Sequence, residues 1–87
     1  MMELNYKELA TKIIELVGKE NISSVSHCAT RLRLIVKDKN KVNVSEIEKL
    51  EEVKGIFFDA GQYQIILGEK ITKYIFNEIS NMGYTII

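Results

Sequence analysis

The sequence predicts an α+β fold: a four-stranded, mostly antiparallel sheet with three helices on one face, in the order α-β-β-α-β-β-α. Segments in which apolar and polar residues alternate occur in two pairs, and only a short turn separates the members of each pair. Segments with helical spacing of apolar residues lie before, between and after these pairs. With 87 residues, the chain has the length of one domain with one core.

The three expected helices are amphipathic and would cover the sheet. The first begins with Asn5 and Glu8 in the pattern of a capping box, and Gly18 can end it in a left-handed conformation. The second can be capped by Asn43 or by Ser45. The third has the clearest apolar stripe in the chain. Tyr74 of this stripe and Tyr63 of the last expected strand are most simply core residues. The expected ranges are about 5–17, 43–52 and 69–82.

The four expected strands are short, and two of them alternate clearly. Their ranges are 22–28, 31–37, 53–59 and 62–67. In the second strand, Leu32, Leu34 and Val36 fall on one face, which we expect to point toward the helices. The opposite face of the sheet is then expected to be open to water. The polar residues expected on that face are Arg31, Arg33, Gln62 and Gln64.

The composition argues against several classes of protein. Twelve basic and twelve acidic side chains cancel, whereas nucleic-acid binders and electrostatic membrane anchors usually carry a basic surface. The apolar runs are too short to span a bilayer, and residues 1–6 lack the apolar core of a signal peptide. A single cysteine forms no internal disulfide, which favours a reducing cytoplasm. No spacing of metal ligands and no cofactor motif is visible.

The segment His27-Cys28-Ala29-Thr30-Arg31-Leu32-Arg33-Leu34 concentrates the reactive chemistry. It holds the only cysteine and the only histidine of the chain. A cysteine in such a domain is either a small buried hydrophobe or, beside arginines, a thiol whose thiolate is stabilised. Spacing of two along a strand places both arginines on one face, where they are either solvated residues or a clamp for phosphoryl oxygens. Spacing alone leaves both readings open.

The neighbouring loop residues suit an anion, and other cysteine chemistries fit less well. Ala29 and Thr30 offer backbone N–H groups, and Thr30 also offers a hydroxyl. His27 faces away from Cys28 if both lie on one strand, so it is expected to frame the loop. A cysteine protease needs a histidine that reaches the sulfur, and a thioredoxin-like motif needs a second cysteine. A tyrosine-phosphatase loop would have arginine where Leu34 stands, and no glycine-rich nucleotide loop is present.

These residues resemble the IIB domain of the bacterial phosphoenolpyruvate-dependent sugar phosphotransferase system, in its glucose/β-glucoside/sucrose type. The resemblance runs from about Tyr6 to Met82. Many relatives carry Gly-Gly-Lys-Glu-Asn where this chain has Gly18-Lys19-Glu20-Asn21, which does not touch the site. The segments that carry the resemblance are Asn21-Ile22, His27-Cys28-Ala29-Thr30-Arg31-Leu32-Arg33, Val53-Lys54-Gly55-Ile56 and Gln62-Tyr63-Gln64-Ile65-Ile66-Leu67-Gly68.

The resemblance implies a phosphotransferase role with defined residues. In the family, a IIA domain phosphorylated on histidine donates its phosphoryl group to a cysteine of IIB, which passes it to a sugar held by the membrane domain IIC. Carried over, Cys28 is the phosphorylated cysteine, and Arg31 and Arg33 are the arginines that follow it. Thr30 is the loop residue that binds phosphoryl oxygens, beside Ala29. Histidine at the variable position before the cysteine suits the β-glucoside/sucrose side of the family.

The resemblance also implies the setting of the domain. Residues 1–83 are expected to form the IIB domain, and residues 84–87 a tail or the start of a linker to IIC. The implied partners are phosphorylated IIA and sugar-loaded IIC, with no nucleic acid, and the isolated domain is expected to be monomeric. It would work in the cytoplasm, at the cytoplasmic face of the membrane when joined to IIC. The alternative is a non-catalytic regulatory or binding module in which Cys28 is structural.

Overall fold

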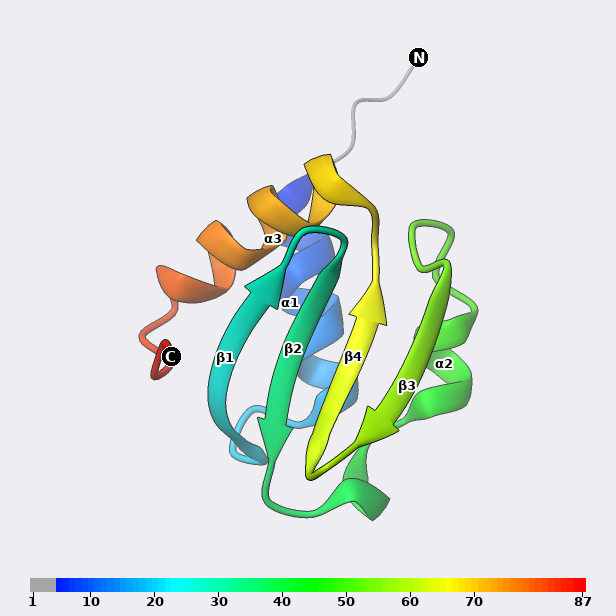
Figure 1. The fold of residues 1–87 in the computed structure, drawn as a ribbon, viewed down its shortest axis with the longest axis vertical. Coiled ribbons are helices and arrows are strands. Elements are labelled where there is room, and N and C mark those ends of the chain that lie inside the picture. Colours follow the sequence, from blue (N-terminus) through cyan, green and yellow to red (C-terminus); the bar gives the residue numbers. More distant parts are fainter. Residues whose placement is uncertain (1–4) are drawn as a thin grey trace.

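The computed structural model describes residues 5–87 and has the expected fold (Figure 1). Three α-helices cover one face of a four-stranded antiparallel sheet, whose strand order is β1-β2-β4-β3. The predicted element order is confirmed, with one short 3-10 helix added after β2. The elements are α1 Tyr6–Val17, β1 Ile22–Cys28, β2 Arg31–Val36, η1 Lys39–Lys41, α2 Val44–Glu48, β3 Gly55–Asp59, β4 Gln62–Ile66 and α3 Glu69–Ser80. Residues 1–4 of the expected domain lie outside the described range.

Two hairpins form the sheet, and their inner strands pair with each other. Ala29 and Thr30 connect β1 to β2, and Ala60 and Gly61 connect β3 to β4. The φ angles of Ala60 and Gly61 are 51° and 81°, and two positive values suit the right-handed twist of a tight hairpin. β2 and β4 lie antiparallel in the centre. Both hairpins are thereby held in one sheet, which places β1 and β3 at its edges.

The core lies between the sheet and the helices, as the alternation predicts. Leu32 and Leu34 of β2 and Ile65 of β4 point toward the helices and are fully buried. Helices α1 and α3 lie side by side behind the sheet in the view of Figure 1, and α2 lies behind β3. No helix of residues 5–87 lies on the opposite face of the sheet, so the face expected to be open to water is confirmed.

Asn21 joins three parts of the fold at the end of the sheet where β1 begins. Its side-chain amide donates hydrogen bonds to the carbonyl of Val17 at 3.1 Å and to that of Asp38 at 2.9 Å. Its Oδ1 accepts a hydrogen bond from the Asp38 N–H at 2.8 Å. The side chain is buried, so these bonds satisfy polar groups that water does not reach. Asn21 therefore ties the end of α1 to the chain that follows β2.

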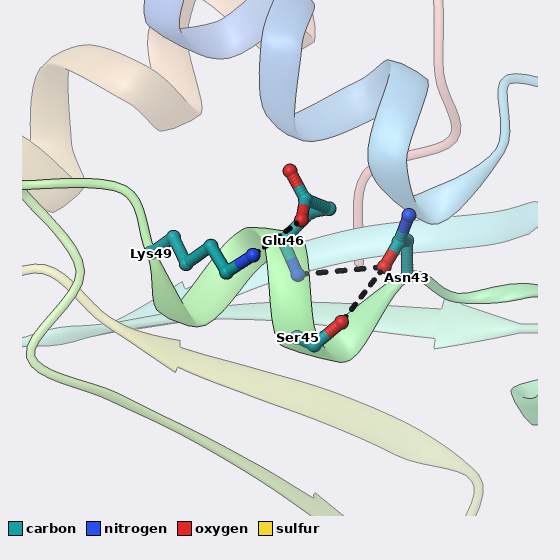
Figure 2. A network of polar contacts seen from close by, with 4 residues as sticks. All are labelled: Asn43, Ser45, Glu46 and Lys49. Carbon is teal, nitrogen blue, oxygen red and sulfur yellow. Dashed lines mark hydrogen bonds and ion pairs between the residues drawn. The ribbon is translucent and has the colours of Figure 1, made fainter.

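Helix α2 is shorter than the sequence indicates. Figure 2 shows that Asn43 is its cap, because Oδ1 accepts hydrogen bonds from the Glu46 N–H at 3.4 Å and the Ser45 hydroxyl at 3.3 Å. Lys49 forms an ion pair with Glu46 at 3.0 Å. The helix ends at Glu48 and not at about residue 52, because the chain continues in turns with hydrogen bonds three residues apart. The next strand accordingly begins at Gly55 and not at residue 53.

The last residues, which carry no clear sequence pattern, lie beside the edge strand β1. Val25 donates its N–H to the Thr85 carbonyl at 2.8 Å, and Ile87 donates its N–H to the Val25 carbonyl at 3.1 Å. The Tyr84 hydroxyl donates to the Lys19 carbonyl at 2.9 Å, and burial raises the pKa of that hydroxyl. Residues 84–87 therefore cover part of an edge that would otherwise expose unpaired backbone groups.

Two tyrosines expected in the core differ in their burial. Tyr63 of β4 is buried, and its hydroxyl donates to the Lys39 carbonyl at 3.1 Å. Tyr74 of α3 is 42% exposed, so its placement in the core was wrong. Its ring stacks on Tyr6 of α1 with centroids 4.7 Å apart, at the rim of the contact between the two helices. Helical spacing identifies the inward side of a helix, but it does not distinguish the centre of a helix contact from its edge.

Candidate functional site

Cys28 is the last residue of β1 and is exposed. Successive strand residues point to opposite faces, and Val25 on this strand is fully buried against the helices. His27 shares the face of Val25, whereas Cys28 lies on the face that no helix covers. The thiol therefore stands at the end of a strand, on the open face, where a second protein can reach it.

The loop after Cys28 is anchored through the carbonyl of Thr30. This oxygen accepts hydrogen bonds from the Leu67 N–H at 3.0 Å and the Gly68 N–H at 3.2 Å. These two residues connect β4 to α3, so the loop is fixed beside the beginning of that helix. Ala29 and Thr30 are both exposed. The anchor holds the loop from behind and leaves its outer side accessible.

Arg31 lies opposite Cys28 in the sheet, but its guanidinium turns away from the β1 strand. The two residues are register partners across the β1–β2 pair and share the open face. Arg31 Nη1 donates a hydrogen bond to Gln64 Oε1 at 2.9 Å. The guanidinium carbon lies 5.7 Å from the centroid of the Phe57 ring. The structure thus brings the backbones of Arg31 and Cys28 together, while the charged group contacts β4 and β3.

Arg33 occupies the next position on the same face of β2. It pairs with Ser26 of β1 and with Gln64 of β4, and it is half-buried. Its Nε atom is buried and has no hydrogen-bond partner among the described residues. Leaving such a buried donor without a partner is costly, so Nε lowers stability, and only the more exposed end of the guanidinium is available to an anion on the open face. As their spacing predicts, Arg31 and Arg33 lie on one face of β2, Arg31 at the loop and Arg33 deeper on the sheet.

His27 lies on the other side of the strand from the thiol. Its ring packs against the ring of Phe76 in α3, with centroids 4.2 Å apart and planes tilted by 49°. The side chain therefore faces the helix layer, as the alternation along β1 predicts. This contact suits a residue that fixes the end of β1, and the ring is not placed beside Cys28 on the open face.

The site contains two further side chains that the sequence did not single out. Gln64 was regarded as an ordinary strand residue, yet it is buried between Arg33 and Phe57 and holds Arg31. Phe57 is 53% exposed on the same face, in the edge strand β3. Both could have been found only from the register of β2, β4 and β3, because alternation gives the face of a residue but not its neighbours across the sheet.

The chemistry available to this arrangement is that of a thiol with two permanent cations. A thiolate is the nucleophilic form of cysteine, and guanidinium groups bind phosphoryl oxygens in pairs. Within residues 5–87, no group of three or more metal-ligating side chains comes together. No helix in the same range is long and apolar enough to cross a membrane. The site therefore fits transfer of an anionic group to and from sulfur.

Comparison with known proteins points to one family. The sequence model described as "phosphotransferase system, EIIB" matches residues 11–43. The chain is 50% identical over 78 residues to the PTS system sucrose-specific EIIBC component of Bacillus subtilis (strain 168), covering 88% of this chain and 17% of that protein. It is 39% identical over 84 residues to the PTS system trehalose-specific EIIBC component of Escherichia coli (strain K12), covering 95% of this chain and 18% of that protein.

A solved structure extends the similarity over most of both chains. The crystal structure of one domain of the PTS system IIabc component from Clostridium difficile superposes with a TM-score of 0.91. Its sequence identity is 46%, and the match covers 94% of this chain and 86% of that one. The curated relatives are longer, since the chain spans only 17% of the Bacillus subtilis protein.

Proposed function

The chain belongs to the EIIB family of the sugar phosphotransferase system, and on that premise we propose that Cys28 is a phosphoryl relay. It accepts a phosphoryl group from the phosphohistidine of a IIA domain and passes it to a sugar held by a membrane IIC domain. The sugar is of the sucrose or β-glucoside class, because the relatives include sucrose-specific components. The single observation that carries the proposal is an exposed thiol on the uncovered face, with Arg31 opposite in register.

The first step forms a phosphorus–sulfur bond. Cys28 loses its thiol proton, and the thiolate attacks the phosphorus of the donor phosphohistidine. The phosphorus–nitrogen bond breaks, its electron pair returns to the donor imidazole, and that ring takes up a proton. Exposure of Cys28 at a strand end gives the donor access, and anchoring of the Thr30 carbonyl limits movement of the loop.

The second step returns the sulfur to its starting state. A sugar hydroxyl attacks the phosphorus, the phosphorus–sulfur bond breaks, and the electron pair leaves with the thiolate. The hydroxyl proton passes to a base of the acceptor domain or to water. Arg31 and Arg33 neutralise the phosphoryl oxygens, which lie roughly in a plane between the entering oxygen and the leaving sulfur. The loop at Ala29 and Thr30 adds backbone N–H groups for the same anion.

Docking to both partners takes place around the Cys28 loop. A relay must release each partner after transfer, so we expect small, transient interfaces and a monomeric domain in solution. The domain then works at the cytoplasmic face of the membrane, where IIC is embedded. The alternative is a regulatory module with a structural cysteine. A structural cysteine is usually buried, and the exposure of Cys28 favours the relay.

The test begins with transfer from the donor. The chain is incubated with phosphoenolpyruvate, the general phosphotransferase proteins and candidate IIA domains, without ATP, and intact mass is followed. We expect gain of one phosphoryl group, loss of that gain in Cys28→Ser, and normal gain in Lys37→Gln, a control at the exposed residue that follows the far end of β2. Normal phosphorylation of Cys28→Ser would identify another carrier and end the proposal.

The arginines are tested by comparing the two steps. Arg31→Lys and Arg33→Lys keep the positive charge and lose the planar pair of donors. We expect phosphocysteine formation to fall less than sugar phosphorylation. The charge that favours the thiolate largely remains, whereas transfer to sugar is more demanding because the oxygens must be held while sulfur leaves and a hydroxyl approaches in line. Single-turnover rates of both steps measure the difference. Equal losses would mean that these side chains tune the thiol or support the fold.

A further inference from the structure

The Arg31 side chain makes its contacts on one side of its own strand. Gln64 Oε1 accepts the hydrogen bond from Nη1 at 2.9 Å, and the Phe57 ring lies 5.7 Å from the guanidinium carbon. The strand order is β1-β2-β4-β3, so Gln64 is one strand and Phe57 two strands from Arg31, both on the side opposite β1. The guanidinium therefore lies over β4 and β3, whereas Cys28 lies on β1, the neighbour of β2 on the other side.

The surroundings of the two contacts suit a defined resting position. Gln64 is buried and directly opposite Phe57 in the β3–β4 pair, so the two side chains are neighbours on the open face. The Phe57 ring lies over Gly55, where an added Cβ would stand 3.5 Å from the ring edge. Because Gly55 pairs with Ile66 and Ile66 with Arg31, the ring reaches into the row of Arg31.

The Arg31 side chain can also adopt a second position, beside the thiol of Cys28. Guanidinium has five N–H donors, and in the described residues the Arg31 guanidinium forms one hydrogen bond, to Gln64. Cross-strand partners lie about 5 Å apart, so rotation of the long side chain brings its donors to an anion on Cys28. A phosphoryl dianion accepts paired, charge-assisted bonds, which are stronger than one bond to an amide oxygen and a cation–π contact.

We propose that Gln64 and Phe57 are positioning residues that hold Arg31 away from β1 until Cys28 carries a phosphoryl group. Arg31 then leaves them and binds the phosphoryl oxygens. This inference rests on the proposed function of Cys28. Its consequence is thermodynamic: the two contacts stabilise the unphosphorylated chain only, so they lower the share of phosphoryl groups that the chain retains at equilibrium with its donor.

Two variants of Gln64 should therefore act in opposite directions. Gln64→Leu removes the acceptor and should raise the ratio of phosphorylated chain to phosphorylated IIA by about three- to tenfold, the range of one hydrogen bond. Gln64→Glu adds an ion pair to the resting position and should lower the ratio. Gln62→Glu places the same charge on the same strand and face, two residues away, as a matched control. Phe57→Leu should raise the ratio by about two- to fivefold through loss of the cation–π contact.

The movement itself can be observed without a donor protein. Iodoacetate converts the Cys28 thiolate to a carboxymethyl thioether, with iodide as leaving group, and places an anion near the phosphoryl position. Iodoacetamide gives the neutral counterpart. The NMR signal of the Arg31 Nε–H group is assigned by its loss in Arg31→Lys. Its position in the spectrum reports whether the guanidinium lies over the ring of Phe57. We expect Phe57→Leu to shift this signal in the unmodified chain and in the neutral iodoacetamide adduct. In the carboxymethyl adduct, Phe57→Leu should leave the signal unchanged.

The outcomes separate the two proposals. Absence of phosphocysteine in the unchanged chain refutes the relay, and the adduct experiment still decides the movement of Arg31. A Phe57-dependent Arg31 signal in the carboxymethyl adduct overturns the positioning role. The same holds if Gln64→Leu and Gln64→Glu shift the phosphoryl equilibrium in one direction, because a merely structural role would do that. Thermal melting confirms that each variant is folded, and Phe57→Leu tests the equilibrium if Gln64→Leu does not fold.

Discussion

Replacement of Asn21 by alanine should separate the stability of the fold from the function of the site. The Asn21 side chain forms three hydrogen bonds, one to the Val17 carbonyl and two to the backbone of Asp38. The side chain is 7% exposed, so water does not replace these bonds freely. At about 1 kcal/mol for each bond, Asn21→Ala should lower the free energy of unfolding by about 3 kcal/mol. In a domain of this size that corresponds to a fall in Tm of roughly 12 to 24 °C.

The assay is urea unfolding together with phosphorylation by IIA at a temperature where the variant is folded. Asn21 lies before the first residue of β1 and Cys28 is its last, so the phosphocysteine yield should stay unchanged. Asn40→Ala, at an exposed residue of the nearby 3-10 helix, is the matched control and should change stability little. A loss below about 1 kcal/mol for Asn21→Ala would refute the reasoning from these three bonds.

Three further changes test other parts of the structure. Thr72→Val should raise the free energy of unfolding by about 1 kcal/mol in urea titrations, because the fully buried hydroxyl has no partner in the described part of the chain; a decrease would reveal a bond to water. Gly68→Ala should cost about 1 to 2 kcal/mol and slow phosphocysteine formation, since φ is +88° and the Gly68 N–H anchors Thr30; an unchanged rate would count against the anchor. Truncation after Gly83 should speed amide hydrogen exchange at Val25, and unaltered exchange would contradict pairing of the tail with β1.

The sequence predicted the faces of the sheet because a strand has a period of two. Alternation placed Leu32 and Leu34 in the core and Arg31 and Arg33 on the open face, and the structure agrees. It also placed His27 and Cys28 on opposite faces, as the structure has them. These predictions needed only local geometry, so they did not depend on how distant segments pair.

What the sequence did not predict depends on contacts across the sheet. The pairing of β2 with β4 decides that Gln64 and Phe57 become neighbours of Arg31, and no local pattern contains that register. The early end of α2 has a different cause: the apolar spacing continues to Leu50, but after Glu48 the chain forms turns with hydrogen bonds three residues apart. Residues 84–87 show no periodic pattern because they form a single bridge to β1, held by two backbone hydrogen bonds that do not depend on the side chains.

The most direct test of the relay is to phosphorylate the chain with IIA, remove the donor, and locate and follow the phosphoryl group by mass spectrometry. Three samples are compared: free sugar, IIC alone, and IIC with sugar. We expect the group on Cys28, persistence with free sugar or with IIC alone, and rapid discharge to sugar only when IIC and sugar are both present. A phosphoryl group found on His27, or rapid sugar phosphorylation by the isolated chain, would contradict the account.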